Sequence, residues 1–581
     1  MIAQVVFDLP LDGPFDYLVP EHLVPQMSVG ARVKVSFGPK MQTGFVIGLL
    51  SHSAIPKLKP IQTLCDNAAI FNMLDLRSAQ DFSGYYGCSL GEALGTMLRN
   101  KEDLDPSIQR DHKPLLSLYR CRSDRYQVKI KEIIDGYRQG TAKDDCHFFI
   151  LVPDAFRAQT LSQQLKGDRS VKIGMRSSVF KCDGRYDCVM MVDEEDESYK
   201  QEQTPMYETR QVILARSLIY GFDIAFLGVS PSVELMSLVR EKQVKLIDDP
   251  DISALSARLI DLSNYKFVPG LISPPVRDAL DAALKAGKKS ILVLNRKGSY
   301  RLTRCVDCGE VLKCSHCDSS LIYSRLEAKF LCRHCTYTAP GDTVCGKCHK
   351  PSWRSMGIGV EQVQTELKKL FPQAKVLAFE RERKKTSISN MPEGAPDILI
   401  ATSAVLRFQG RLRYQMAAFI DFDSELNRLD MRSAFNAFSL ALHISSMTND
   451  LFIQTRNSSH YVLQSLARGK IQDFYNEELK LRKELGFSPF KHWIKIAWRG
   501  KSEKSTMEAA LQVYNELTRS AREGVTITPP LADVVGRKRD QFRFNVMVQA
   551  EQVYSTVAHI RSILQQIKRP GRVIVTLNVD P

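Results

Sequence analysis

Short apolar runs, each followed by polar or turn-forming residues, recur along the middle of this chain. Between residues 115 and 250 these runs are HFFILV (147–152), CVMMVD (188–193) and DIAFLG (223–228), and stretches of helical character separate them. Continuous apolar strands that alternate with helices are typical of parallel sheets, which are buried on both faces. The pattern therefore predicts an α/β lobe in this part of the chain.

A second set of apolar runs of the same kind follows. Its members are SILVLN (290–295), KVLAF (375–379), DILIAT (397–402) and AAFIDFD (417–423). Two such sets predict two α/β lobes. Because a cysteine-rich segment comes directly after SILVLN, we expect that segment to be an insertion in the second lobe.

The two ends of the chain differ from this pattern. The first sixty residues hold the short β-type runs IAQVVFDL, FDYLV, ARVKVSF and TGFVIGLL, broken by Pro and Gly, which predict a small β module. Residues 71–98 favour helix, and the polar stretch 101–113 suits a linker. From about residue 505 the chain offers a helix, the basic segment RKRDQFRF (537–544), a second helix and a closing strand, RVIVTLNV.

Composition narrows the choice of partner. The chain has 581 residues, with 80 Lys and Arg against 65 Asp and Glu, so its formal net charge is +15. An excess of this sign favours polyanions such as nucleic acid, although it also serves solubility. We find no apolar run long enough for a membrane span and no signal-peptide pattern, so we expect a cytoplasmic protein without membrane contact.

Cysteines supply the most specific pattern in the chain. Eight of the 14 cysteines form four Cys-x-x-Cys pairs between residues 305 and 348. In a chain expected to be cytoplasmic, disulfides are disfavoured and a metal is the better interpretation. Two pairs supply the four thiolates that zinc prefers, so the eight cysteines predict two closed, structural Zn²⁺ sites per chain.

The order of the pairs favours a nested arrangement. The segment SSLIYSRLEAKFL between the two inner pairs is typical of a hairpin. A sequential pairing would also satisfy the valences, but a nested one suits an insertion whose ends lie close together. It assigns Cys305, Cys308, Cys345 and Cys348 to zinc 1, and Cys314, Cys317, Cys332 and Cys335 to zinc 2.

An acidic run that begins with Asp193 and Glu194 follows the second apolar strand. Acids at this end of a parallel strand can hold Mg²⁺ for a nucleotide, but they also cap the following helix. No Gly-x-x-x-x-Gly-Lys-Ser/Thr loop precedes Asp193, and the near match at 341–348 ends in a cysteine. We therefore interpret these acids as a degenerate nucleotide site and assign no catalytic residue.

Together these features resemble the primosomal protein N′ (PriA) family, bacterial replication restart proteins with a superfamily 2 helicase-like core. The resemblance runs along essentially the whole chain. Its main carriers, in family order, are LPLDGPFDYLVP, VDEEDESYKQ, the eight-cysteine block and FYNEELKLRKELGFSPF.

This sequence departs from the family pattern where ATP is handled. The phosphate-binding loop is missing, and the D-E-E-H box ends in Asp196. HISSMTND (443–450), which takes the place of the segment with the arginine finger, has no arginine. In this the chain resembles divergent actinobacterial members, which lack recognisable helicase motifs and are thought not to unwind DNA.

The resemblance implies a multidomain α/β fold with two RecA-like helicase lobes. The domains it implies are a 3′-DNA-end-binding β domain at 1–66, a winged-helix-like region with a linker at 67–112, lobe 1 without a P-loop at 113–255, lobe 2 at 256–504 with a zinc insertion at 303–350, and an α+β C-terminal DNA- or partner-binding domain at 505–581.

The resemblance also implies residues that bind DNA. Phe15, Asp16, Tyr17, Gly38 and Lys59 would form the pocket for a 3′ end. A carboxylate can accept a hydrogen bond from a 3′-OH, an aromatic ring can stack on a base, and a lysine can meet phosphate. The alternative is that the aromatic residues are ordinary strand residues and the aspartate a turn acid.

A second set of candidate DNA contacts lies in the basic C-terminal segment. Its members are Arg537, Lys538, Arg539 and Arg543. They suit phosphate contact, although such a run is also typical of a solvated face.

The resemblance thus implies a replication restart protein that binds forked and single-stranded DNA and promotes reloading of the replicative helicase, without helicase activity of its own. Its implied partners are primosome components, the replicative helicase or its loader, and single-strand-binding protein. Two alternatives stay open: an ATP-dependent 3′–5′ DNA helicase with an atypical nucleotide site, and a zinc-ribbon RNA or transcription factor.

Overall fold

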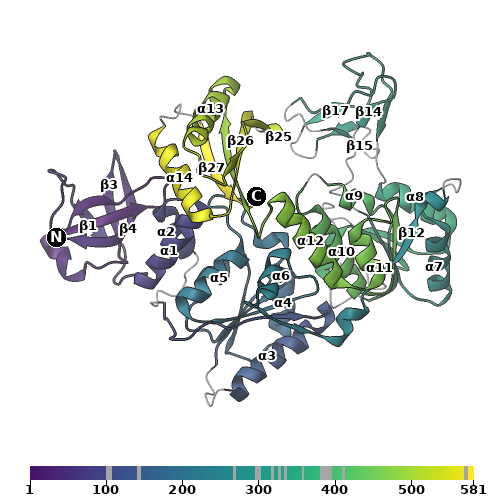
Figure 1. The fold of residues 1–581 in the computed structure, drawn as a ribbon, viewed down its shortest axis with the longest axis horizontal. Coiled ribbons are helices and arrows are strands. Elements are labelled where there is room, and N and C mark those ends of the chain that lie inside the picture. Colours follow the sequence, from purple (N-terminus) through teal and green to yellow (C-terminus); the bar gives the residue numbers. More distant parts are fainter. Residues whose placement is uncertain are drawn as a thin grey trace.

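The computed structural model contains an N-terminal β module, two α/β lobes, a cysteine-rich module and a C-terminal α+β domain (Figure 1). It describes residues 1–581 apart from 100–106, 141–145, 266–269, 295–302, 316–319, 325–328, 333–336, 356–358, 380–395, 409–412, 429, 539 and 568–572. None of the helices in the described part of the chain has both the length and the apolar character that a bilayer span requires.

The N-terminal module is an antiparallel sheet of strand order β2-β1-β4-β3-β5. Its strands are β1 Ile2–Phe7, β2 Phe15–Leu18, β3 Arg32–Phe37, β4 Lys40–Leu50 and β5 Ile61–Leu64. Successive residues of a strand point to opposite faces, so Val33 and Val35 are fully buried while Lys34 between them is exposed. The four strands expected from the sequence are confirmed.

Two helices follow the module, α1 (Met73–Tyr86) and α2 (Leu90–Leu98). Each begins with a capping box in which the N-cap and N3 side chains satisfy each other's backbone N–H groups. Helix α2 lies so close to β1 that a Cβ on Gly91 would come within 1.7 Å of the Phe7 carbonyl oxygen. These two helices are what the structure describes between residues 67 and 99, and the winged-helix assignment of that region stays a prediction.

Lobe 1 is built on a parallel sheet of order β11-β6-β10-β9-β7-β8. Its strands are β6 Leu116–Arg120, β7 Phe148–Leu151, β8 Val171–Gly174, β9 Cys188–Val192, β10 Asp223–Gly228 and β11 Lys245–Asp248. Its helices are α3 Tyr126–Gly140, α4 Ala155–Gln164, α5 Thr209–Tyr220 and α6 Val233–Arg240. The three expected strands, β7, β9 and β10, form the centre of the sheet and are fully buried.

Lobe 2 has a parallel sheet of order β12-β22-β21-β13-β20-β19. Its strands are β12 Arg258–Asp261, β13 Ser290–Val293, β19 Val376–Phe379, β20 Ile398–Ala401, β21 Tyr414–Phe419 and β22 Thr448–Thr455. Its helices, with those that follow it, are α7 Pro274–Lys285, α8 Val360–Leu370, α9 Asp423–Leu426, α10 Ser433–Ser446, α11 Tyr461–Arg468 and α12 Ile471–Leu485.

The two faces of the lobe 2 sheet belong to different cores. Ile291 and Val293 of β13 join the apolar cluster that lobe 2 shares with lobe 1, whereas Leu292 joins a separate cluster with α7 and α8. A strand buried on both faces needs apolar residues at every position. This is why the apolar runs of the sequence predicted these strands correctly.

The cysteine-rich module comes after β13 and before α8, as expected of an insertion in lobe 2. Two short antiparallel sheets form it, β14 (Thr303–Cys305) with β18 (Trp353–Ser355), and β15 (Ile322–Ser324) with β16 (Lys329–Leu331) and β17 (Thr338–Pro340). The antiparallel pair of β15 and β16 confirms the expected hairpin. In Figure 1 the module projects from lobe 2 on the side that also carries the C-terminal domain.

The C-terminal domain is an antiparallel sheet with two helices. Its strands are β23 His492–Gly500, β24 Thr526–Ile527, β25 Leu531–Lys538, β26 Gln541–Ala550 and β27 Ile574–Val579, and its helices are α13 Glu503–Arg519 and α14 Val553–Gln566. Strand β23 pairs with both β26 and β27, although the sequence assigned residues 256–504 to lobe 2. We therefore propose that this domain begins before His492.

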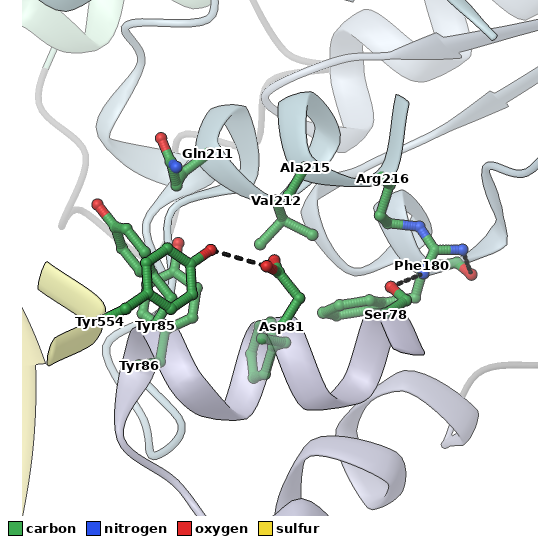
Figure 2. A pocket seen from close by; sticks show the side chains of 11 residues that line it. Ser78, Asp81, Tyr85, Tyr86, Phe180, Gln211, Val212, Ala215, Arg216 and Tyr554 are labelled. Atoms are coloured by element: carbon green, nitrogen blue, oxygen red, sulfur yellow. Dashed lines mark hydrogen bonds between the residues drawn. The ribbon is translucent and has the colours of Figure 1, made fainter. Parts of the chain in front are cut away.

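A three-way joint connects the N-terminal helices, lobe 1 and the C-terminal domain. Tyr554 of α14 donates a 2.8 Å hydrogen bond to Asp81 of α1, and its ring centroid lies 5.5 Å from that of Tyr85 (Figure 2). Arg216 of α5 donates a 3.0 Å hydrogen bond to Ser78 of α1. The space left among these side chains is about 10 Å³, room for roughly one water molecule. The joint holds three parts of the chain together and leaves no room for a larger ligand.

Candidate functional site

The acidic run of lobe 1 begins where β9 ends, at the edge of the sheet that faces lobe 2. Asp193 adopts a left-handed conformation (φ 47°), and its N–H donates a 2.7 Å hydrogen bond to the Leu227 carbonyl of β10. Aspartate tolerates this region of φ better than most residues. The side chains of Asp193 and Glu194 are each 2% exposed, so both acids need partners within the protein.

Both carboxylate oxygens of Asp193 are bound by protein side chains. Arg157 of α4 donates from Nη1 to Oδ2 at 2.6 Å, and the Tyr126 hydroxyl of α3 donates to Oδ1. Burial lowers the pKa of Arg157, but the charges of Asp193 and Asp196 outweigh it and raise that pKa above its ordinary value. Burial, and then the charge of Asp193, raise the pKa of Tyr126. The arginine is therefore charged and the tyrosine neutral, and Asp193 already has its counter-ion.

Glu194 lies in a second buried ion pair. Arg210 of α5 binds Glu194 Oε2 at 2.8 Å, and the Ser232 backbone N–H donates to Oε1 at 2.6 Å. Because Ser232 is the N-cap residue of α6, Glu194 bonds to a backbone group at the start of that helix. This arrangement supports a structural role for Glu194, which was the alternative to magnesium binding.

Glu195 makes a contact that crosses from lobe 1 to lobe 2. Its Oε1 lies 2.8 Å from Nε2 of His443 on α10, and the two side chains are only 5% and 6% exposed. Burial raises the pKa of Glu195 to about 7, although His443 opposes the shift. Burial lowers the pKa of His443, but the hydrogen bond that His443 makes to Glu195 outweighs it and raises that pKa. The folded pair therefore retains a proton into the neutral pH range.

Asp193, Glu195 and His443 also lie close enough together to be tested as a metal site. Their ligand atoms are all within 4.8 Å of one another. However, Arg157 already neutralises Asp193, and His443 is already paired with Glu195. A divalent cation would have to displace both partners and accept a guanidinium group beside it, so this donor set does not fit a metal ion.

Four cysteines of the inserted module, in contrast, form a cluster suited to a metal ion. Cys305 Sγ lies 3.5 Å from Cys348 Sγ, and Cys308 Sγ lies 3.5 Å from Cys345 Sγ. A tetrahedron of Zn–S bonds of about 2.3 Å has edges of about 3.8 Å. These are the four cysteines that the nested arrangement assigned to zinc 1, and the structure brings them together.

The two halves of this cluster share one backbone design. The Cys305 N–H bonds to the Glu310 carbonyl and the Gly309 N–H bonds back to Cys305, while Cys345 bonds in the same way with Lys350 and His349. His349 has a φ of 57° and Gly309 a φ of 76°, at equivalent positions. Each half is therefore a tight turn that presents two sulfurs.

The inner cysteines are described in part. Cys314 and Cys332 are buried in one apolar cluster with Leu321 and Phe330. Cys317 and Cys335, the other two residues assigned to zinc 2, lie outside the described residues. The second four-cysteine site stays a prediction.

Two residues assigned to the 3′-end pocket, Phe15 and Tyr17, contact the end of β3 that leads to Gly38. The rings of Phe15 and Phe37 are 5.2 Å apart, and Phe37 is followed by Gly38 in the turn between β3 and β4. Gly38 has a φ of 60°, and a Cβ placed on it would meet no atom within 4 Å. Tyr17 is buried, and its hydroxyl donates to the Ser36 carbonyl at 3.2 Å, so it holds the end of β3 just before the turn.

The other two residues of this set lie on adjacent chain segments. Ser53 donates a 2.5 Å hydrogen bond to Asp16 Oδ2, and the Leu18 N–H bonds to the carbonyl of Lys59. Lys59 is exposed. Phe15 and Tyr17 thus contact β3 just before the Gly38 turn, while Asp16 and Lys59 contact Ser53 and Leu18.

The basic C-terminal residues lie on one hairpin. Arg537 and Lys538 are on β25, and Arg543 is on the neighbouring strand β26, opposite Arg499 of β23. Arg543 Nε is buried and has no hydrogen-bond partner among the described residues. Arg539 lies outside the described residues. The hairpin therefore places three of the four assigned residues on two paired strands.

Sequence analysis missed the partners of the acidic run. Arg157, Tyr126, Arg210 and His443 come from four different helices, α4, α3, α5 and α10. His443 is 248 residues away from Glu195, and no spacing pattern links the two. The absence of a phosphate-binding loop was the only signal that these acids had another role.

Known proteins of one family resemble this chain at both ends and along its whole length. The 3'DNA-binding domain (3'BD) family profile matches residues 4–99, and the Primosomal protein N C-terminal domain profile matches residues 483–581. The chain is 25% identical over 657 residues to the replication restart protein PriA of Treponema pallidum, covering 100% of this chain and 99% of the relative. It is 22% identical over 654 residues to the PriA of Rickettsia conorii, with coverage of 100% and 99%. Among solved structures, it has a TM-score of 0.34 and 9% identity to yeast Dbp5 bound to RNA and ADP BeF3, covering 67% of this chain and 97% of that one.

Proposed function

This chain belongs to the family of the replication restart protein PriA, and we propose that it serves replication restart as a DNA-binding factor that does not hydrolyse ATP. The observation that carries the second half of this proposal is the state of Asp193. Both of its carboxylate oxygens are bound by Arg157 and Tyr126. A Mg²⁺–nucleotide would have to break the buried pair of Asp193 with Arg157.

The chain also lacks the other parts that phosphoryl transfer needs. No glycine-rich loop with a lysine precedes Asp193 in the sequence, and catalysis of this reaction depends almost entirely on positioning and charge stabilisation at the phosphates. Glu194 is bound to Arg210 and to the start of α6. These points support a helicase-like core that holds its shape without a nucleotide.

DNA recognition then rests on the two ends of the chain. We infer that Phe15, Asp16, Tyr17, Gly38 and Lys59 receive the 3′ end of a nascent strand, with Asp16 as the acceptor for the terminal hydroxyl. The family match over residues 4–99 supports this assignment. Arg537, Lys538, Arg539 and Arg543 would bind phosphate groups of the same fork.

The cysteine cluster would hold a structural Zn²⁺ ion. The thiolates of Cys305, Cys308, Cys345 and Cys348 fill all four positions of a tetrahedral ion, so the metal would supply folding energy and no catalysis. We further infer a second ion at Cys314, Cys317, Cys332 and Cys335. The small module has few apolar residues of its own, and two metal ions would stabilise it.

The partners that follow from this function are forked and single-stranded DNA, primosome components, the replicative helicase or its loader, and single-strand-binding protein. Bound at a fork, the protein would recruit these proteins and leave the unwinding to the reloaded helicase.

An ATPase assay on forked DNA tests the proposal directly. We expect no fork-stimulated hydrolysis by the purified chain, and tight binding to forks with a free 3′-OH. Hydrolysis that Asp193→Asn abolishes would instead establish an ATP-dependent helicase with an atypical site. Preference for structured RNA over a fork would point to the RNA- or transcription-factor alternative.

A further inference from the structure

Lobe 1 and lobe 2 touch at several separate places along the edge where the strands of lobe 1 end. Glu195 meets His443 of α10 there at 2.8 Å. Nearby, the Arg122 guanidinium donates a 2.6 Å hydrogen bond to the Ser446 carbonyl at the end of the same helix. Arg157, which also binds Asp193, donates a 3.4 Å hydrogen bond to the Leu406 carbonyl of lobe 2. Each contact joins a loop or helix start of lobe 1 to backbone or side chain of lobe 2.

A second group of contacts joins α6 of lobe 1 to helix α12, which follows lobe 2 and packs on α11. Arg482 of α12 lies 3.0 Å from Glu234 of α6, and the two side chains are 6% and 16% exposed. The Tyr475 hydroxyl of α12 donates a 2.5 Å hydrogen bond to the Pro231 carbonyl. Arg482 also binds Glu478 on its own helix at 2.8 Å, which fixes the guanidinium in place. Burial raises the pKa of Glu234, but the charges of Arg482 and then Arg210 outweigh burial and lower that pKa, so this acid is charged.

Apolar packing continues through the same boundary. One cluster of buried residues includes Phe226 and Leu227 at the end of β10 in lobe 1, and Phe438 of α10 with Phe474 of α12 on the other side. The rings of Phe438 and Phe474 are stacked at 3.7 Å between centroids. A boundary that moves during a working cycle must expose and rebury its surface at each step, and a continuous apolar core opposes this.

We propose that the boundary between the lobes is a permanently closed joint, in which the Glu195–His443 and Glu234–Arg482 pairs hold lobe 1 and lobe 2 as one rigid body without any ligand. This inference rests on the proposed loss of ATP turnover, and it goes beyond it. A protein can lack ATPase activity and still have lobes that move freely. Here lobe 2 would be fixed to lobe 1, and through it to the joint where the N-terminal helices and the C-terminal domain meet lobe 1.

The arrangement of the charges supports this assignment. Separation of the lobes would take His443 from Glu195 and Arg482 from Glu234, which would keep only Arg210 of its own lobe at 3.7 Å, and it would expose the apolar residues beside them. The Glu195 Oε2 atom is buried and has no hydrogen-bond partner among the described residues, so His443 is the group that satisfies this carboxyl. Because this carboxyl depends on His443, a substitution of His443 alone should weaken the joint.

Distance measurement between the lobes tests the joint. Because the chain has 14 cysteines, some of them assigned to metal, dyes would be attached through non-natural residues at the exposed positions Lys131 of α3 and Lys369 of α8. Single-molecule energy transfer on the full chain should give one narrow distance distribution. We expect that neither ATP with Mg²⁺ nor a non-hydrolysable analogue changes its mean or its width.

Variants of the joint provide the second arm of the test. His443→Leu leaves Glu195 buried without its partner and should broaden the distribution, whereas the double change Glu195→Leu with His443→Leu should restore a narrow one. Glu197→Gln, at an exposed acid of the same loop, is the control and should leave the distribution unchanged. If His443→Leu proves insoluble, the nucleotide titration of the unchanged chain still decides.

The outcomes separate this inference from the proposed function. A broad distribution in the unchanged chain, without ATP hydrolysis, would overturn the joint and leave the proposed function standing. A shift of the mean upon addition of nucleotide would overturn the joint as well. Hydrolysis with an unchanged narrow distribution would contradict the proposed function and leave the joint intact.

Discussion

Arg157 Nη1 lies 2.6 Å from Asp193 Oδ2, at the end of β9 where a nucleotide enzyme would hold magnesium. The aspartate is 2% exposed, and the arginine comes from the neighbouring helix α4 of the same lobe. A cation carried by the protein itself therefore balances the acid.

Removal of this cation should destabilise the chain without producing an enzyme. Arg157→Met leaves Asp193 as an unpaired buried charge, which costs about 3–5 kcal/mol. The double change Arg157→Met with Asp193→Asn removes that charge and should recover most of the loss. Urea unfolding of the two variants checks both values. Equal stability of Arg157→Met and the unchanged chain would show that the pair contributes little.

Stability should fall as pH rises through the neutral range. Burial raises the pKa of Glu195 from its ordinary 4.5 to about 7, and Glu195 raises the pKa of His443 above its ordinary 6.5 in spite of burial. A raised pKa in the folded state means that the folded pair binds its proton more tightly than the unfolded chain does. The stabilisation is therefore complete at low pH, and it is lost between pH 4.5 and about 7 for Glu195 and from pH 6.5 upward for His443.

Melting temperatures measured from pH 6 to pH 9 check this dependence. Asp193, Glu194 and Arg157 face the same pair, but the buried carboxylates there have their own cations. His492, whose pKa Asp580 raises in spite of burial, contributes a loss of the same sign. The double change Glu195→Gln with His443→Gln removes both groups and should therefore flatten the curve in part, and His492→Gln should flatten it further. A curve that the double change leaves unchanged would contradict the assignment.

Local patterns in the sequence predicted the strands with unbroken apolar runs and missed several strands without them. Strands such as β9 and β20 are buried at every position, so their residues form unbroken apolar runs. Strand β8 (Val171–Gly174) is half exposed at the edge of its sheet and has no such run. Strand β22 begins with the polar residues of TNDLFIQT, which hid a buried second half. Strands of this kind owe their place to pairing with a neighbour, and no apolar run within the strand records that.

The candidate sites divide in the same way. The outer cysteine cluster followed from the Cys-x-x-Cys spacing, because each tight turn brings two sulfurs together within four residues. The partners of the acidic run could not be predicted. Arg157 lies 36 residues from Asp193, and His443 lies 248 residues from Glu195, so only the packed fold brings them together.

Metal analysis should give about two zinc ions per chain. Cys345→Ser removes one thiolate of the outer cluster and should lower the count by one, and Cys314→Ser should do the same at the inner site. Because each ion stabilises only the inserted module, neither change should unfold the N-terminal module. Cys65→Ser, at an exposed cysteine outside the clusters, is the control. Two ions retained in Cys345→Ser would refute the ligand assignment.

Arg543 of β26 should contribute to DNA binding through charge alone. Arg543→Gln should weaken binding to all forks uniformly and reduce the slope of log K against log salt by about 1. Arg519→Gln on α13 is the control, because this exposed arginine pairs with Glu516 on its own helix. Fluorescence anisotropy at several salt concentrations provides both values, and an unchanged slope in Arg543→Gln would place the residue outside the interface.

The 3′-end pocket should distinguish a free 3′-OH from a blocked one. Asp16 accepts a hydrogen bond from Ser53 at Oδ2, and a carboxylate has further lone pairs that can accept from a terminal hydroxyl. Phe15→Ala removes a stacking surface worth about 1–3 kcal/mol per base, so affinity for a fork should fall at least roughly fivefold. Asp16→Asn should instead reduce the preference for a free 3′ end while general affinity is retained.

Glu21→Gln, at an exposed acid of the same module, is the matched control. Binding of forks with free, phosphorylated and dideoxy 3′ ends checks these expectations, and a chain that binds all three equally would not use this pocket for the 3′ end.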